Sequence, residues 1–234
     1  MTRCWICGAP ADSGEHKAKA SDVRSILGTP TQHKPFHLRS QKDGNLKLIG
    51  VNVDAIKWDD KICSHCNNAV SAPYDRAWEQ LSTFLQKFPS GLPSINLQTI
   101  YGPEYQTQVQ NLYLYFVKLF GCYIVNSDVA IDTGDFSKSL LEKCDLSDFY
   151  IRCSYFPNWP VEKMIALTDL EVANDQYGPC IAIAGYAIGP WCIDMTYWAT
   201  RANAPPIIAS SFKPSIKHKT LVVNQVKTSL QTSF

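Results

Sequence analysis

Residues 4–7 read Cys-Trp-Ile-Cys, residues 63–68 read Cys-Ser-His-Cys-Asn-Asn, and a Gly-Glu-His triplet at residues 14–16 lies between them. Each cysteine pair has the two-residue spacing that places two thiolates on one side of a tetrahedral metal ion. Two such pairs supply a complete set of four ligands. The sequence therefore predicts a structural zinc ion bound by Cys4, Cys7, Cys63 and Cys66. The alternative is two buried or redox-active cysteine pairs.

The two pairs are separated by the 55 residues 8–62, which is a long loop for one metal site. Closing a loop of this length costs roughly 3 to 4 kcal/mol of chain entropy. Structural zinc on thiolates contributes on the order of 10 to 16 kcal/mol. Because zinc binding contributes more free energy than closing the loop costs, the long spacing does not argue against one ion shared by both cysteine pairs.

Composition indicates a packed globular protein of one large or two small domains, with 234 residues of which 45% are hydrophobic. No apolar run in the sequence is long enough for a membrane span, and we expect no signal peptide. The nine cysteines are an odd number, so we do not expect a disulfide scaffold. We expect the protein to be cytoplasmic. The net charge of +1 is uninformative about partners.

The helical pattern is clearest in the middle of the chain. Apolar residues three and four apart predict helices over 75–88 and 104–121, and a short helix over 136–144 with Asp135 as its N-cap. Turn-forming residues in 28–45 indicate an insertion loop, followed by a strand over 46–53. From residue 150 onward strand signals dominate, at 150–156, 164–172, 180–188, 191–198 and 220–224.

These elements predict an α+β protein in two parts. Residues 1–90 would form a zinc-stabilised module and residues 95–234 a helix followed by an antiparallel β domain, with the boundary in the Pro- and Gly-containing segment 89–94. The role of the second part is not indicated by its sequence. We expect it to be a place where a regulatory protein or small molecule could bind.

Three residues near the cysteines suggest hydrolytic chemistry. Glu15 offers an oxygen ligand of the kind that magnesium or manganese prefers, and the adjacent His16 titrates near neutral pH and could activate water. Asn67 follows a zinc ligand directly, so zinc would fix its amide oxygen in place. The alternatives are a surface position for His16 and a helix-capping role for Asn67.

The order of these residues resembles the HNH endonucleases, which have the ββα-metal fold. Members with two zinc knuckles carry C-x-x-C, an acidic residue with histidine, then C-x-x-C-N, and Ser21 also lies where the family often has serine. The resemblance covers about residues 1–75. It implies that His16 is the general base and that Glu15 and Asn67 hold a catalytic Mg²⁺ or Mn²⁺, while the four cysteines hold structural Zn²⁺.

The expected reaction is therefore hydrolysis of DNA phosphodiester bonds, in a setting such as a phage or bacterial defence system. Lys17, Lys19 and Arg24 are the predicted DNA contacts, with solvated surface as the alternative. His33 and His37 lie in the expected insertion loop, where exposure is favoured over phosphate or metal contact. The family usually has Ile-x-Pro after the histidine, and here residues 17–19 are Lys-Ala-Lys. A non-catalytic zinc module that binds nucleic acid or protein is thus the second hypothesis.

Overall fold

The computed structural model describes residues 2–40, 44–50, 56–59, 61–88, 91–127, 129–157, 164–199, 211–212 and 219–226. Its largest feature is a seven-stranded sheet in the order β3-β9-β4-β8-β7-β5, with β6 paired to β7. The strands are β3 (Ser94–Asn96), β4 (Phe149–Tyr155), β5 (Ile165–Leu167), β6 (Glu171–Asp175), β7 (Gly178–Ile188), β8 (Trp191–Trp198) and β9 (Thr220–Gln225). This mixed α and β architecture confirms the coarse fold class predicted from the sequence.

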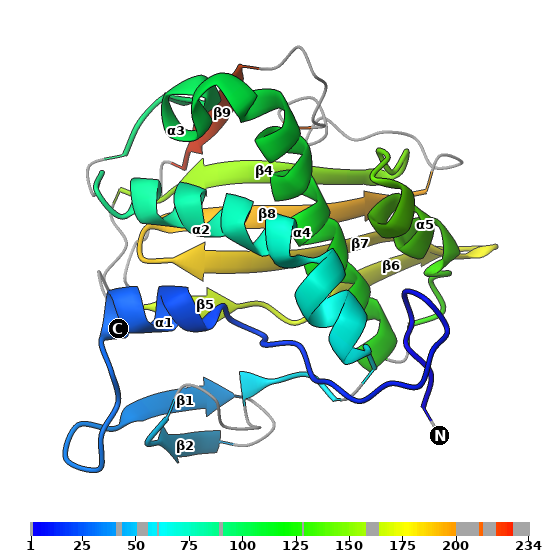
Figure 1. Ribbon diagram of the computed structural model, residues 1–234, viewed down its shortest axis with the longest axis horizontal. Coiled ribbons are helices and arrows are strands. Elements are labelled where there is room, and N and C mark those ends of the chain that lie inside the picture. Colours follow the sequence, from blue (N-terminus) through cyan, green and yellow to red (C-terminus); the bar gives the residue numbers. More distant parts are fainter. Residues whose placement is uncertain are drawn as a thin grey trace.

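Helices cross one face of this sheet (Figure 1). They are α1 (Ala20–Leu27), η2 (His65–Val70), α2 (Ala72–Leu85), α3 (Leu97–Tyr101), η3 (Gly102–Glu104), α4 (Tyr105–Asn126) and α5 (Gly134–Glu142). The three predicted helices correspond to α2, α4 and α5. Thr133, and not the predicted Asp135, occupies the N-cap position of α5, and Asp135 lies in its first turn.

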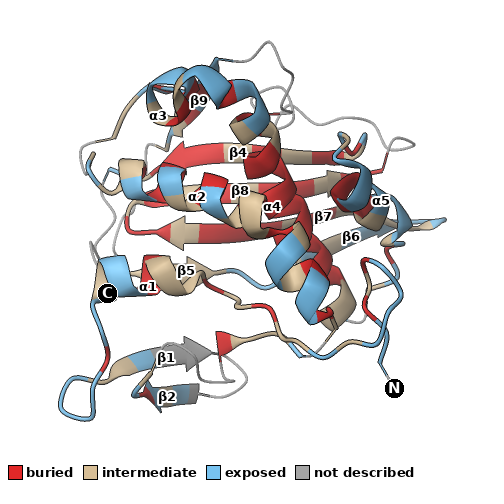
Figure 2. Cartoon of the chain, in the orientation of Figure 1, coloured by how far each residue is buried: buried red, intermediate tan, exposed pale blue. Residues whose placement is uncertain are grey.

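The central helix α4 is buried along most of its length, as Figure 2 shows. A helix that is hydrophobic on all sides must be enclosed, and α4 packs against both α2 and the sheet. Trp78 of α2 stacks on Tyr115 of α4 at 5.6 Å and meets Tyr186 of β7 edge-on at 5.5 Å. These contacts join the helical layer to the sheet.

Three strand predictions need correction. The strand expected over 164–172 is two strands, β5 and β6, which both pair with β7. The expected loop 28–45 contains β1 (Phe36–Ser40), which forms a separate two-stranded sheet with β2 (Gly44–Leu48). Apolar and polar residues alternate in β1, but the surrounding turn-forming residues obscured that signal. In addition, β9 pairs in parallel with β4, so the sheet is not wholly antiparallel. Alternation in β9 fixes which residues face the core and carries no information about strand direction.

Residues on both sides of the predicted domain boundary share one core, which extends from Cys4 and Trp78 to Leu221 and Val223. Residues 89–90 of that boundary lie outside the described part of the chain. The division into two domains stays a prediction. Among the described residues, no helix has the length and apolar character to cross a membrane.

Trp5, between the first two cysteines, packs against Gly121 of α4. A methyl group added at Gly121 would lie 2.2 Å from the indole ring of Trp5. This distance is far below van der Waals contact. The absence of a side chain at Gly121 is therefore what allows the first cysteine pair to lie against α4.

We predict that Gly121→Ala destabilises the protein by about 1 to 3 kcal/mol, because the indole must move out of a packed site. Without that clash, alanine in mid-helix would stabilise by up to about 1 kcal/mol. Urea unfolding measures the difference. Gly134→Ala is the control, because its added methyl meets the flexible end of the Asp132 side chain at 3.3 Å. Equal stability of Gly121→Ala and the parent protein would contradict the packing argument.

Candidate metal centre and adjoining ionic cluster

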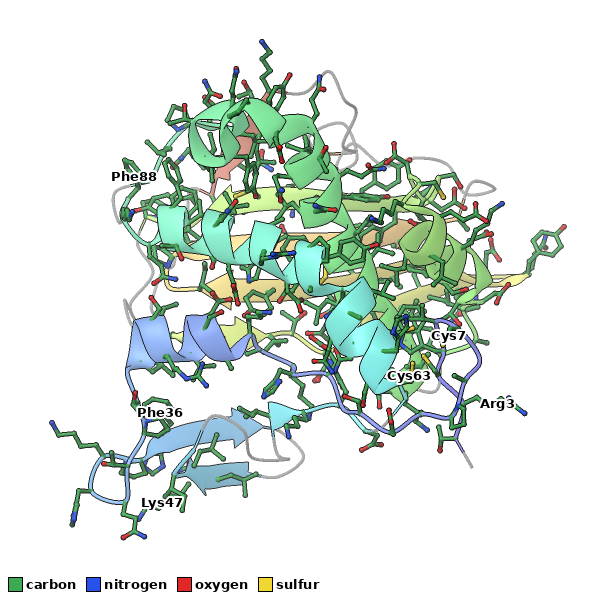
Figure 3. The ribbon with its side chains drawn as sticks, in the orientation of Figure 1. Arg3, Cys7, Phe36, Lys47, Cys63 and Phe88 are labelled. Atoms are coloured by element: carbon green, nitrogen blue, oxygen red, sulfur yellow. The ribbon has the colours of Figure 1, made fainter. Side chains whose placement is uncertain are left out.

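The four predicted zinc ligands converge on one point. The Sγ atoms of Cys4, Cys7, Cys63 and Cys66 all lie within 4.8 Å of one another. Cys7 and Cys63 lie side by side in Figure 3, with their sulfurs 3.6 Å apart. Four thiolates about 2.3 Å from a tetrahedral zinc ion would be separated by about 3.8 Å. The cluster is therefore compatible with structural zinc.

Local backbone bonds shape each half of the cluster. In the first pair, the Gly8 N–H donates to the Cys4 carbonyl at 2.9 Å, and Gly8 has φ of 75°. In the second, the Asp12 carboxylate accepts from both the backbone and the hydroxyl of Ser64. The Trp5 N–H donates to the Lys61 carbonyl at 3.0 Å and so fixes the two pairs next to each other.

The thiols differ in acidity. Burial raises the pKa of Cys66, and hydrogen bonds with Cys7 and Cys63 raise it further. Burial also acts to raise the pKa of Cys63, but the Cys66 N–H and the neighbouring thiols hold it below its ordinary value. A cation is required to keep all four as thiolates, and its binding would release protons.

Glu15 is buried and does not lie in an open cleft. Its Oε2 is 3.1 Å from the Nζ of Lys118, a side chain of α4 that is 1% exposed. The same Nζ lies 3.1 Å from the Asp75 carboxylate and donates to the Ser71 hydroxyl at 3.1 Å. Burial alone would lower the pKa of Lys118, but the two carboxylates raise it overall. The lysine is therefore held in its charged form.

Lys19 extends this ionic cluster toward the surface. Its Nζ is 3.3 Å from Asp75 and 3.5 Å from Glu79. Three carboxylates, those of Glu15, Asp75 and Glu79, thus surround two ammonium groups. The cluster is left with one excess negative charge. Burial is the main cause that raises the pKa of Glu15, against the opposing effect of Lys118.

Residues 13–17 lie in an extended segment that pairs with residues 56–58 and with residue 62. The Trp58 N–H donates to the Glu15 carbonyl at 2.7 Å, and the Lys17 N–H donates to the Ile56 carbonyl at 2.8 Å. Glu15 faces Lys118 of α4, and the next residue, His16, is half-buried.

The Asn67 amide lies against the same extended segment. Its Nδ2 donates to the Ser13 hydroxyl at 2.9 Å and is 3.5 Å from the Gly14 carbonyl. The N-cap positions of η2 and α2 are Ser64 and Ser71, so Asn67 does not cap either helix. The second cysteine pair therefore fixes the Asn67 amide beside the strand-like segment that carries Glu15 and His16.

Two of the three predicted DNA contacts have partners within the protein. Lys17 lies over the ring of Trp58, with 5.2 Å to its centroid, and Lys19 is part of the ionic cluster. Arg24 is exposed on α1. Ser21, the serine that is part of the resemblance described above, donates its hydroxyl hydrogen to the Glu79 carboxylate at 3.2 Å.

Sequence reasoning missed Ser71, Asp75 and Lys118. A signal existed for Lys118, because a lysine in the otherwise apolar run Phe116–Phe120 must be paired once that helix is buried.

Sequence reasoning also missed Asp22, which is 1% exposed. Its Oδ2 accepts from Trp78 Nε1 and from the Tyr186 hydroxyl, each at 2.7 Å. Asp22 thereby joins α1, α2 and the sheet.

Comparisons of this chain with protein-family models, with curated proteins and with solved structures give no match. The interpretation of the site therefore depends on its own geometry.

We predict that Cys66→Ser abolishes zinc binding and lowers the melting temperature, because three thiolates leave the tetrahedral site incomplete. Elemental analysis of the purified protein should give about one zinc per chain for the parent and almost none for the variant. Cys144→Ser is the matched control, because Cys144 lies outside the cluster. Zinc retained at parental levels in Cys66→Ser would contradict the shared four-sulfur site.

We predict that Lys118→Met destabilises the protein by about 3 to 5 kcal/mol, because Glu15 and Asp75 lose their buried cation. Adding Glu15→Gln to Lys118→Met should recover part of this loss, which a double-mutant cycle in urea would measure. The raised pKa of Lys118 means that its contribution is complete below the ordinary value of 10.5 and declines only as pH rises beyond it. Lys143→Met, at an exposed position, is the control. Strictly additive effects of the two substitutions would contradict the ion pair.

Proposed function

We propose that this chain is a metal-dependent endonuclease of HNH type that hydrolyses DNA phosphodiester bonds. The observation that carries the proposal is the position of Asn67. The cysteine cluster holds its amide against the segment that contains Glu15 and His16. The segment 13–17, which pairs with residues 57 and 62, and those partners both precede the helical residues 65–85. That order is the one expected of a ββα-metal module.

The chain retains oxygen donors for a divalent cation. Lys118 contacts Oε2 of Glu15, and Asn67 uses its Nδ2 toward Ser13, which leaves Oε1 of Glu15 and Oδ1 of Asn67 as candidate ligands. Magnesium commonly takes one or two such protein oxygens together with water and substrate phosphate. The excess negative charge of the ionic cluster favours a cation nearby. When bound, the cation would stabilise the charge that develops on the phosphate.

His16 would accept a proton from the attacking water while the water oxygen forms the new bond to phosphorus. The bond from phosphorus to the leaving sugar oxygen breaks, and that oxygen takes a proton from solvent. Lys118 is a positioning residue in this scheme, because it holds one oxygen of Glu15 and leaves the other for the cation. Histidine suits the role of base because it changes charge near neutral pH.

We predict that His16→Ala lowers plasmid nicking in Mg²⁺ or Mn²⁺ by at least about 100-fold, the usual contribution of a general base. The measurement is the rate of conversion of supercoiled to open-circular DNA. His65→Ala is the matched control, since His65 is an exposed histidine in the second cysteine pair. Equal rates for His16→Ala and the parent protein, or no nicking by either, would reject the catalytic proposal.

One observation favours a second function, that of a non-catalytic zinc-stabilised module that binds nucleic acid. Glu15 already has a buried cation, the ammonium of Lys118, at 3.1 Å. A carboxylate paired in this way has less need of a metal. Manganese binding separates the two functions. Saturable Mn²⁺ binding lost in Asn67→Ala supports the nuclease, whereas DNA binding without any Mn²⁺ binding supports the module.

A further inference from the structure

The β1–β2 hairpin stands apart from the rest of the fold. It forms its own two-stranded sheet, and Figure 1 shows it beyond α1, away from the seven-stranded sheet. Phe36 and Leu48 are paired at one end of the hairpin. Phe36 packs against the core and Leu48 is 8% exposed, so this end is anchored by apolar contact.

The next positions along the hairpin are polar and basic. His37 pairs with Lys47, and Arg39 pairs with Asn45. His37, Asn45 and Lys47 are exposed, and His37 Nδ1 is 3.3 Å from Asn45 Oδ1. In Figure 3, Phe36 lies toward α1 and Lys47 toward the outer side of the hairpin. The ribbon thus presents polar side chains to solvent beside its apolar anchor.

Basic residues outnumber acidic residues in this part of the chain. Residues 31–50 hold four of the 22 Lys and Arg but one of the 21 Asp and Glu, which leaves 18 basic and 20 acidic residues elsewhere. His33 and Lys34 are exposed in the turn that leads into β1. A protein of nearly neutral charge therefore carries a local basic arm on an otherwise slightly acidic body.

We infer that the β1–β2 hairpin is the arm by which this protein grips duplex DNA, with its basic residues along the phosphates and the ribbon in the major groove. This inference rests on the proposed DNA substrate and assigns the surface that binds it. The major groove of B-form DNA, about 12 Å wide, admits a two-stranded ribbon. The major groove of A-form RNA is too narrow and deep for side chains to enter, so the inference commits to DNA.

The arm also explains how DNA could be held when Lys17 and Lys19 are engaged within the protein. Lys17 lies over Trp58, and Lys19 pairs with Asp75 and Glu79. The exposed side chains of Lys34 and Lys47 would then supply sequence-independent attraction to phosphate.

The test compares two double variants of the full-length protein, each with two lysines neutralised. Lys34→Gln/Lys47→Gln changes the arm, and Lys87→Gln/Lys138→Gln removes the same charge from exposed positions on the body. Both are made in His16→Ala protein, so that cleavage does not disturb the measurement. Fluorescence anisotropy with a labelled 20-bp duplex is recorded over a range of salt concentrations, after equal melting temperature and zinc content have been verified.

The arm variant should bind more weakly, and the slope of log affinity against log salt should fall by about 2, one for each lost phosphate contact. The body variant should keep the parental slope. Equal slopes for both variants, no duplex binding by the parent, or equal binding of a double-stranded RNA of the same sequence would each overturn the inference. If plasmid nicking fails while the slope change is found, the nuclease proposal falls and the arm remains.

Discussion

A buried ammonium group has to be paired, and this requirement shapes the protein around Lys118. The charge lies on α4, the helix that the sheet and α2 enclose. Its partners are Glu15 in the extended segment, Ser71 at the N-cap of α2 and Asp75 within α2. Removing any one partner would leave a largely buried charge or polar atom with fewer partners, at a cost of about 1 to 5 kcal/mol. Three parts of the chain are therefore fixed in one arrangement by a single side chain.

The cysteine cluster fixes the same region from the other side. It joins the N-terminal residues to the start of the helix that contains Asn67, and Trp5 packs this cluster against Gly121, one turn of α4 beyond Lys118. A metal ion in the cysteine cluster would restrain the backbone, whereas the ionic cluster restrains side-chain direction. Together they decide that Glu15 faces inward and that Asn67 lies against Ser13.

The features that the sequence could predict were local ones. Cysteine spacing indicated the four-sulfur cluster, and the three-and-four spacing of Trp78, Leu81 and Leu85 indicated α2, because each pattern is complete within a short stretch. The partner of Glu15 could not be predicted, since Lys118 is brought to it by the folding of distant segments. The parallel pairing of β9 with β4 could not be predicted either, because it also joins segments that are distant in the sequence. For Lys118 itself, an isolated charge in an apolar helix was a usable signal that a partner existed, though not which one.

The charges around the site bear on how a nucleic acid could approach it. Glu15, Asp75 and Glu79 outnumber Lys19 and Lys118, so the ionic cluster would repel a phosphate unless a divalent cation lay between them. Attraction of the polyanion must then come from elsewhere on the chain, and residues 31–50, with four Lys and Arg against one Asp, are a basic stretch that could supply it. In this scheme, DNA affinity and phosphodiester hydrolysis depend on different parts of the protein. The basic arm would hold the duplex whether or not a cation is bound, and the cation would decide whether the phosphate can reach His16.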